Sequence, residues 1–180
     1  AHLSGNSLYS IYQSAYTKFH STETALLALY DHLVRATTHQ NISCLCLLDL
    51  PAAFDTIDHT ILLQRLTNWF GISGTVHSWL KSYVTSRSFS VLANGHKSVS
   101  TPLSCGVPQG SILGPLLFIM YTTPLSSLLS TTTADHHLYA DDTQLFISFS
   151  PSQFAASINH LQSVFTQVSS WMSANLLSLN

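Results

Sequence analysis

The feature that most constrains the fold is a short apolar run that ends in a carboxylate. Residues 42–50 read ISCLCLLDL and follow Asn41. Because the run is almost continuously apolar, it predicts a buried strand. Asp49 lies near its end, where a carboxylate is costly unless it is paired or coordinates a metal ion. All Lys and Arg residues are distant from Asp49 in sequence, although folding can bring one close. Asp49 is therefore a candidate functional residue.

The composition fits a single domain, or a fragment of one. The chain has 180 residues, of which 46% are hydrophobic and only 8% are charged, whereas ordinary soluble domains carry about a quarter charged residues. The formal net charge of −2 provides neither a basic field typical of nucleic-acid-binding surfaces nor an acidic tail. The three cysteines have no framework spacing, which indicates a reducing compartment and no disulfides.

Neither a membrane span nor a signal peptide is expected. The longest strongly apolar run, residues 112–121, contains Pro115 and is about half as long as a bilayer-spanning helix. The first residues, AHLSG, do not lead from a charged segment into an apolar one. The chain lacks an initiator Met and ends inside a helical pattern, so we expect both termini to be cuts in a longer protein.

Apolar residues at helical spacing predict five helices. These helices lie at about 21–40, 62–70, 76–84, 111–129 and 151–172. Two hairpins are also expected, one joining 89–93 to 96–101 and one joining 137–139 to 144–149. The first turns at Asn94-Gly95, a dipeptide that supplies the positive φ angles of a type I′ turn.

The first and last of these helices carry start signals and apolar stripes. Ser21 or Thr22 is the expected cap of the first helix. Ser150 is the expected cap of the last, with Pro151 in the first helical position and Gln153 completing a capping box. The stripes consist of Leu26, Leu29, Tyr30, Leu33 and Val34 in the first helix and of Phe154, Ile158, Leu161, Phe165, Val168 and Met172 in the last.

Five of the eight acidic residues lie in two short segments: Asp49, Asp55 and Asp58, and Asp141 and Asp142. Adjacent residues on a flat strand point to opposite faces, so Asp141 and Asp142 meet only if the backbone turns between them. Three converging carboxylates without enough His or Cys bind hard cations such as Mg²⁺ or Mn²⁺. The matching chemistry is two-metal phosphoryl or nucleotidyl transfer. Alternatively, Asp141-Asp142 are ordinary turn residues and Asp49 caps the turn that follows its strand.

Three ordered segments carry a family resemblance. They are LLDLPAAFDTIDHTILLQRL (47–66), GVPQGSILGPLLF (106–118) and YADDTQLF (139–146). Together they resemble the central sequence blocks of reverse transcriptases, most closely those of non-LTR, LINE-like retrotransposons. QSAYTKFHSTETALL (13–27) and WMSANLLSLN (171–180) also resemble that group. The resemblance implies an α+β right-hand polymerase palm, an antiparallel sheet backed by helices, with a fingers-proximal part at about 1–40 and the palm at 41–180.

The resemblance also implies an activity, RNA-directed DNA polymerisation. Such an enzyme adds a dNTP to the 3′-OH of a DNA primer on an RNA template, using Mg²⁺ or Mn²⁺. Asp49, Asp141 and Asp142 are then the catalytic residues and the metal ligands. The fingers, thumb and endonuclease parts of the parent protein are expected to lie outside this chain.

Further residues acquire substrate-binding roles through the resemblance. Phe54 matches a steric gate that disfavours a 2′-OH, and its alternative role is that of a core aromatic. The other implied contacts are the backbone N–H groups of Ala52 and Ala53 to the triphosphate, Gln109 to the incoming nucleotide, Gly106 and Gly110 to the base pair, and Tyr139 to the primer terminus. Asp58 is expected to cap a helix and Asp55 to be a hydrogen-bonded turn residue.

Two departures from the family pattern leave a second interpretation open. Pro51 replaces a small polar residue beside Asp49 and removes a backbone donor. Thr17 replaces an Arg near the nucleotide path. Both favour a catalytically inactive remnant of such a domain. A different two-metal phosphotransferase is a further alternative, against which Phe54 and Gln109 argue. A zinc site formed by Cys44, Cys46, His136 and His137 is disfavoured, because Cys44 and Cys46 are typical small core residues.

Overall fold

The structure is a computed structural model that describes residues 3, 6 and 8–179. The chain divides into two compact units, which we describe separately. The sheet unit consists of Tyr9–Ala53 and Thr122–Asn180, and the helix-pair unit consists of Ala1–Leu8 and Phe54–Tyr121. The expected class, α+β with antiparallel sheets and helices, is confirmed.

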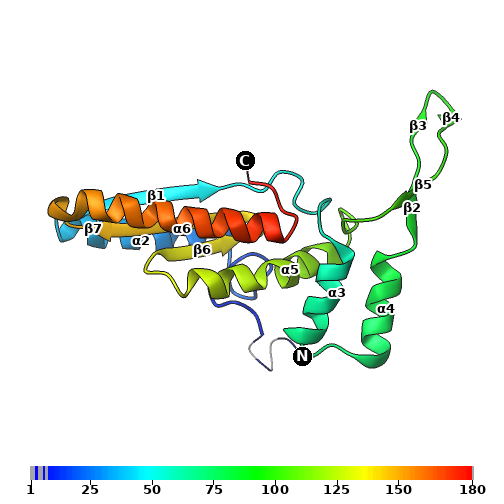
Figure 1. Cartoon of the computed structure of the whole chain (residues 1–180), viewed down its shortest axis with the longest axis horizontal. Coiled ribbons are helices and arrows are strands. Elements are labelled where there is room, and N and C mark those ends of the chain that lie inside the picture. Colours follow the sequence, from blue (N-terminus) through cyan, green and yellow to red (C-terminus); the bar gives the residue numbers. More distant parts are fainter. Residues whose placement is uncertain (1–2, 4–5, 7, 180) are drawn as a thin grey trace. The chain divides into compact units, whose positions relative to one another are not determined.

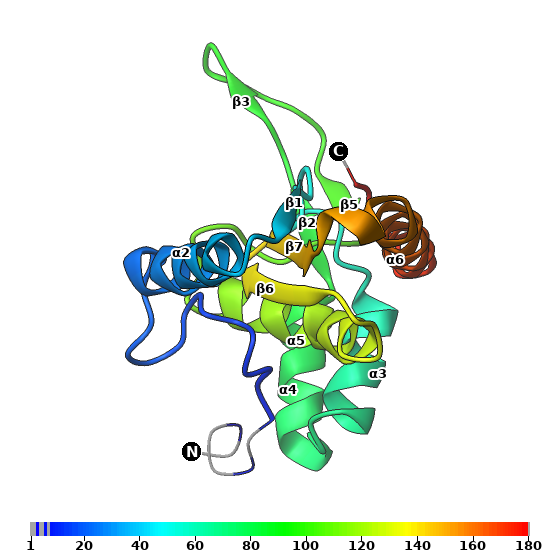
Figure 2. The same cartoon turned by 90° about the vertical axis from the view of Figure 1, so that its left-hand side faces the viewer.

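The sheet unit is built on three antiparallel strands in the order β1 (Ile42–Leu48), β7 (Asp142–Phe149) and β6 (Asp135–Tyr139). Figure 2 shows helix α2 (Thr22–Thr38) on one side of this sheet and α6 (Phe154–Ala174) on the other. Alternate residues of β7 face the two helices, as strand geometry requires. Phe146 contacts His32 of α2 at 4.5 Å between ring centroids, and Phe149 contacts Phe154 of α6 at 6.0 Å.

The expectation of a fully buried first strand is wrong. β1 pairs with β7 only, among the described residues, and is therefore an edge strand. Leu48 is buried, but the Leu47 side chain is 69% exposed. A continuous apolar run identifies a strand without showing which protein segment covers it, so its burial was overestimated.

The first and last predicted helices are confirmed in place, but their buried faces differ from the expected stripes. The capping box at the start of α2 is formed by Ser21 and Thr24. In α2 the buried residues are Ala25, Leu29 and Ala36, whereas Leu26, Leu27, Tyr30 and Val34 are exposed. In α6 the buried residues are Leu161, Val164, Val168 and Met172, whereas Phe154 and Phe165 are exposed.

The expected cap of the last helix is not formed. Ser150 precedes a single 3-10 turn, η1 (Pro151–Gln153), and makes no side-chain bond to a backbone N–H there. Its hydroxyl is bonded instead to the side chains of Ser152 at 2.8 Å and Gln153 at 3.2 Å. Polar side chains that compete for the capping hydroxyl explain the difference.

The helix-pair unit contains α3 (His59–Asn68) and α4 (Gly74–Val84), which lie side by side in Figure 1. Asp58 caps α3 as expected, accepting a 2.9 Å bond from the Ile61 N–H. Gly71, with φ of +60°, follows the end of the helix, as the sequence predicts. The long helix α5 (Leu113–Leu129) begins in this unit and ends in the sheet unit.

The first predicted hairpin is confirmed but has shorter strands. β2 (Arg87–Phe89) pairs with β5 (Thr101–Leu103), and β3 (Leu92–Ala93) pairs with β4 (His96–Lys97). Asn94 and Gly95 have φ angles of 49° and 78°, the positive pair that a type I′ turn requires.

Three further observations concern the whole described chain. Cys44, Cys46 and Cys105 are free thiols, as expected. No helix of the described residues has the length and apolar character needed to cross a bilayer. In the same residues, no three His, Cys, Asp or Glu side chains are gathered as a ready metal-binding group.

Candidate active site

The strand register brings two of the predicted site carboxylates to the same end of the sheet. Leu48 is paired with Thr143, so the next positions along the two strands are Asp49 and Asp142. Tyr139 is paired with Asp142 on the other side of β7. Residues opposite each other on neighbouring strands point to the same face. Tyr139 and Asp142 are therefore directly paired, and Asp49, the first residue after β1, follows at the same end of the sheet.

Asp141 reaches this end of the sheet through a two-residue turn. Because Tyr139 pairs with Asp142, only Ala140 and Asp141 connect β6 to β7. Ala140 has a φ of 54°, in the left-handed region that alanine rarely adopts. The backbone thus turns immediately before Asp141, which allows Asp141 and Asp142 to approach one site.

Electrostatics couples the three carboxylates. The pKa of Asp142 is raised above its ordinary value, first by desolvation and then by the negative charges of Asp141 and Asp49. Asp142 therefore lies close enough to each of the other two carboxylates to be repelled by it, although no three such side chains are gathered as a metal-binding group in the described residues. An all-oxygen, acidic donor set of this kind suits Mg²⁺ or Mn²⁺, and a divalent cation would relieve the repulsion. The donor chemistry of these residues fits such an ion, whereas their side chains do not form a preformed site.

One residue at this end was missed by the sequence analysis. Gln13 is only 2% exposed. Its Oε1 accepts hydrogen bonds from the backbone N–H groups of Ala140 at 3.1 Å and Ala15 at 2.9 Å. Its Nε2 lies 3.5 Å from the Ala140 carbonyl oxygen, to which it donates. No local pattern announces this contact, since Gln13 and Ala140 are 127 residues apart.

The backbone around Gln13 extends the sheet beyond β6. The Leu138 N–H donates to the Tyr12 carbonyl at 2.8 Å, and the Ser14 N–H donates to the Leu138 carbonyl at 3.0 Å. Gln13 thereby forms a parallel bridge with Leu138. The segment that holds Gln13 is thus fixed to β6 by backbone bonds on both sides of it.

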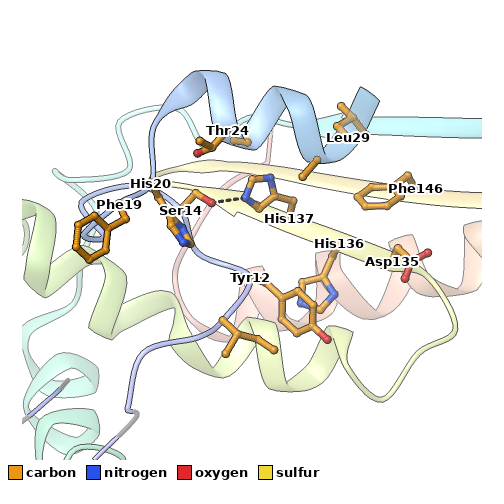
Figure 3. A pocket seen from close by; sticks show the side chains of 13 residues that line it. Tyr12, Ser14, Phe19, His20, Thr24, Leu29, Asp135, His136, His137 and Phe146 are labelled. Atoms are coloured by element: carbon orange, nitrogen blue, oxygen red, sulfur yellow. Dashed lines mark hydrogen bonds between the residues drawn. The ribbon is translucent and has the colours of Figure 1, made fainter. Parts of the chain in front are cut away.

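A cavity of about 450 Å³ lies between this segment, α2 and β6 (Figure 3). Ser14 Oγ and His137 Nε2 are hydrogen-bonded at 2.7 Å, and the Tyr12 and His136 rings lie 4.1 Å apart. Burial lowers the pKa of His136 to about 4, partly opposed by the charge of Asp135. Burial also lowers the pKa of His137. Both imidazoles are therefore neutral near pH 7.

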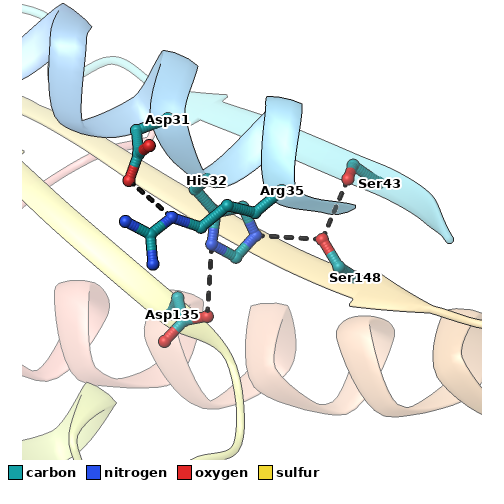
Figure 4. A network of polar contacts seen from close by, with 6 residues as sticks. All are labelled: Asp31, His32, Arg35, Ser43, Asp135 and Ser148. Atoms are coloured by element: carbon teal, nitrogen blue, oxygen red, sulfur yellow. Dashed lines mark hydrogen bonds and ion pairs between the residues drawn. The ribbon is translucent and has the colours of Figure 1, made fainter. Parts of the chain in front are cut away.

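A second polar cluster joins α2 to the sheet (Figure 4). His32 Nε2 is hydrogen-bonded to Ser148 Oγ at 2.9 Å, and Ser148 Oγ to Ser43 Oγ at 2.9 Å. His32 Nδ1 lies 3.9 Å from a carboxylate oxygen of Asp135, beyond hydrogen-bond length. The Asp-His-Ser order thus lacks the tight orienting bond of a nucleophilic triad, and the cluster is a structural connection.

In the helix-pair unit, Phe54 stacks on Phe118 with ring centroids 4.9 Å apart. Phe118 is fully buried, whereas Phe54 is half-buried. One side of the Phe54 ring is therefore fixed by the core. This half-buried position is compatible with both predicted roles of Phe54, that of a core aromatic and that of a steric gate.

The loop that begins at Gly106 is anchored to residues 54–59. The Gly106 N–H donates to the Ile57 carbonyl and the Val107 N–H to the Phe54 carbonyl, both at 2.8 Å. His59 Nε2 is bonded to the Gly106 carbonyl at 2.7 Å. A Cβ on Gly106 would lie 2.9 Å from the Asp55 backbone oxygen. The close backbone approach at Gly106 is thus made to the chain itself.

The other residues that are predicted to contact the nucleotide differ in exposure and in hydrogen bonding. Gln109 Nε2 donates to Asp55 Oδ2 at 3.2 Å, which confirms Asp55 as a hydrogen-bonded residue. Gly110 has a φ of +76° and open space where a Cβ would stand. Ala53 is buried, whereas Ala52 is exposed with a φ of 53°.

Comparison with known proteins identifies the fold and the relatives. The family described as "Reverse transcriptase (RNA-dependent DNA polymerase)" matches residues 2–180. A probable RNA-directed DNA polymerase from transposon BS of Drosophila melanogaster is 29% identical over 174 residues, which are 94% of this chain and 19% of the relative. The RNA-directed DNA polymerase from mobile element jockey of the same species is 29% identical over 137 residues, 73% of this chain and 15% of the relative. The chain thus spans less than a fifth of these relatives.

Solved structures with the same fold include two telomerases. One from Candida albicans gives a TM-score of 0.65 at 13% identity, covering 94% of this chain and 31% of the telomerase chain. An apo telomerase from Candida tropicalis gives 0.63 at 12% identity, covering 94% and 32%. These similarities confirm the right-hand polymerase fold. The mobile-element relatives confirm the resemblance to non-LTR, LINE-like elements.

Proposed function

The chain belongs to the reverse transcriptase family, and from this membership we propose that it is the palm of a retrotransposon RNA-directed DNA polymerase. The reaction is attack of a DNA primer 3′-OH on the α-phosphate of a dNTP, directed by an RNA template. The observation that carries the proposal is the strand register, which brings Asp49, Asp142 and the turn that contains Asp141 to the same end of the sheet. Residues 1–40 form a fingers-proximal part and residues 41–180 the palm.

Asp49, Asp141 and Asp142 are the residues that would hold Mg²⁺ or Mn²⁺. When bound, such ions would lower the pKa of the attacking hydroxyl and would stabilise the charge that develops on the phosphate. The chain contributes the rigid sheet end from which the carboxylates project. Because Asp142 begins β7 and Asp141 lies in a two-residue turn, both carboxylates are tied to the strand pairing.

The remaining roles concern the nucleotide. Phe54, held by its stacking on Phe118, disfavours a 2′-OH on the incoming sugar. Gln109 exchanges its bond to Asp55 for one to the nucleotide. The other proposed contacts are the backbone of Ala52, Ala53 and Gly110, and Tyr139 near the primer terminus.

The test is primer extension by a chimera in which this chain replaces the matching segment of the jockey polymerase. A DNA primer on an RNA template is incubated with dNTPs and Mg²⁺. Asp141→Asn/Asp142→Asn should lower incorporation at least about 1,000-fold, since the ions supply several kcal/mol of transition-state stabilisation. The matched control is Asp31→Asn, which removes a carboxylate that pairs with Arg35 on α2. Equal activity in the parent and the double variant would refute the proposal.

A catalytically inactive remnant is the second candidate, favoured by two observations. Thr17, where the family has Arg, is hydrogen-bonded to the Gln13 and Ala15 carbonyls at 3.1 and 3.3 Å. Pro51 directly precedes Ala52, which has a left-handed φ. If the folded chimera does not extend primers, reversion by Pro51→Ser and Thr17→Arg tests whether these substitutions abolished activity.

A further inference from the structure

We propose that Gln13 is a positioning residue for nucleotidyl transfer, whose buried amide fixes the turn that presents Asp141 and Asp142. The inference rests on the proposed function for its catalytic part. Its structural part, that one side chain sets the conformation of the turn, is independent of any activity.

The turn between β6 and β7 contains a strained residue. Two residues connect β6 to β7, and the first of them, Ala140, has a φ of 54°. Such a conformation costs an L-residue about 1–2 kcal/mol, and glycine, which avoids this cost, is absent here. Something outside the turn must therefore offset the strain.

Gln13 makes contacts of the kind required. Its Oε1 binds the Ala140 N–H at 3.1 Å and its Nε2 faces the Ala140 carbonyl at 3.5 Å. The N–H belongs to the peptide plane before Ala140 and the carbonyl to the plane after it. One amide therefore holds both planes, and the second of these leads directly into Asp141.

Gln13 is itself immobilised. Oε1 also accepts the Ala15 N–H at 2.9 Å, and the side chain is 2% exposed. The bridge to Leu138 fixes its backbone against β6. Because both the backbone and the side-chain amide of Gln13 are fixed, the position of the turn is coupled to that of strand β6. Catalytic groups need such support, because small displacements of ligands are costly to the rate.

The experiment compares three variants in the 180-residue chain and in the jockey chimera. Gln13→Met keeps the side-chain length and removes both polar groups. Gln13→Glu keeps the acceptor for the Ala140 N–H. Ser14→Ala is the matched control, because it removes the 2.7 Å bond to His137 from the same segment without touching the turn.

The first readout is amide hydrogen exchange in a peptide covering residues 139–143. We expect exchange at Ala140 to be about tenfold faster in Gln13→Met, since the N–H loses its acceptor. It should be about threefold faster in Gln13→Glu, which keeps the Oε1 acceptor but loses the Nε2 donor to the Ala140 carbonyl, and should stay close to the parent rate in Ser14→Ala. Gln13→Glu also keeps the test valid if Gln13→Met does not fold. Unchanged exchange in Gln13→Met or in Gln13→Glu, exchange in Gln13→Glu as fast as in Gln13→Met, or equal acceleration in Ser14→Ala would overturn the inference.

The second readout is the metal dependence of primer extension. In the chimera, Gln13→Met should raise the Mg²⁺ concentration for half-maximal activity about fivefold and lower kcat, leaving the KM for dNTP unchanged. A change in KM alone would contradict a positioning role. If the parent chimera does not extend primers, the proposed function fails, and the exchange rates still decide whether Gln13 sets the turn.

Discussion

The side-chain amide of Gln109 donates a hydrogen bond to the Asp55 carboxylate, with Nε2 and Oδ2 3.2 Å apart. Both residues are exposed, so water competes for each group and the bond contributes no more than about 1 kcal/mol. Gln109 can therefore leave Asp55 at little cost when a nucleotide offers another partner.

Removing this competing partner should strengthen nucleotide binding. In the chimera, Asp55→Ala is expected to lower the KM for dNTP about two- to fivefold at constant kcat, because Gln109 no longer has to break a bond. Steady-state incorporation kinetics measure the effect, with Asp31→Ala as the control. A higher KM would contradict it and indicate that Asp55 instead orients Gln109 for the nucleotide.

The two glycines of the 106–110 loop should respond differently to alanine. At Gly106 a Cβ would lie 2.9 Å from the Asp55 backbone oxygen, in addition to a φ of +85°. Gly106→Ala is therefore expected to lower the free energy of unfolding by about 3 kcal/mol. Gly110→Ala introduces only the strain of positive φ, about 1 kcal/mol. Urea unfolding checks both values, and equal losses would refute the close packing at Gly106.

His136 should make folding sensitive to mild acid. Burial lowers its pKa to about 4 from 6.5, so between these pH values the unfolded chain binds a proton that the native chain does not. Stability is therefore complete above pH 6.5 and falls by up to about 3 kcal/mol as the pH drops to 4.

The measurement is urea unfolding of the chain between pH 7 and pH 4, compared with His136→Phe. The phenyl ring retains a ring contact for Tyr12 and cannot be protonated. Subtracting the free energy of unfolding of the variant from that of the parent removes the contribution of the carboxylates that titrate in both proteins. A variant whose stability falls as steeply as that of the parent over this interval would contradict the role of His136.

The exposed face of α2 should limit solubility. Leu26 and Tyr30 are 59% and 65% exposed and lie one turn apart. Leu26→Glu/Tyr30→Lys replaces them by a favourable charge pair. The saturating concentration should rise, while the free energy of unfolding changes by no more than about 0.5 kcal/mol. The buried counterpart Leu29→Glu should prevent folding. An unchanged saturating concentration would show that another surface limits solubility.

Local signals in the sequence predicted local structure well. The caps at Ser21 and Asp58 and the Asn94-Gly95 turn were correct, because each depends on residues within three or four positions of itself. The carboxylate-bearing turn at Asp141 was correct for the same reason. The order of the three motifs also identified the family, because a motif is recognised from the sequence alone and needs no knowledge of the fold.

Long-range features could not be predicted in this way. The apolar run at 42–48 revealed a strand but not that Leu47 is exposed at a sheet edge, because exposure depends on which segments pack against the strand. The apolar stripe predicted for α2 included both Leu29 and Tyr30, but of these two residues only Leu29 is buried. Gln13 begins a segment that resembles the family, but nothing in that segment indicated its hydrogen bond to Ala140, which is 127 residues away.

The most direct test of the account is divalent-cation binding by the chain alone. Mn²⁺ binding is followed by electron paramagnetic resonance in the parent, in Asp49→Asn, Asp141→Asn and Asp142→Asn, and in Asp55→Asn as the control from the same motif. We predict binding by the parent and by Asp55→Asn, and affinity at least about tenfold weaker in each of the other three, because each replaces a negatively charged carboxylate ligand by a neutral amide. Equal Mn²⁺ affinity in all five proteins would contradict a metal site formed by Asp49, Asp141 and Asp142.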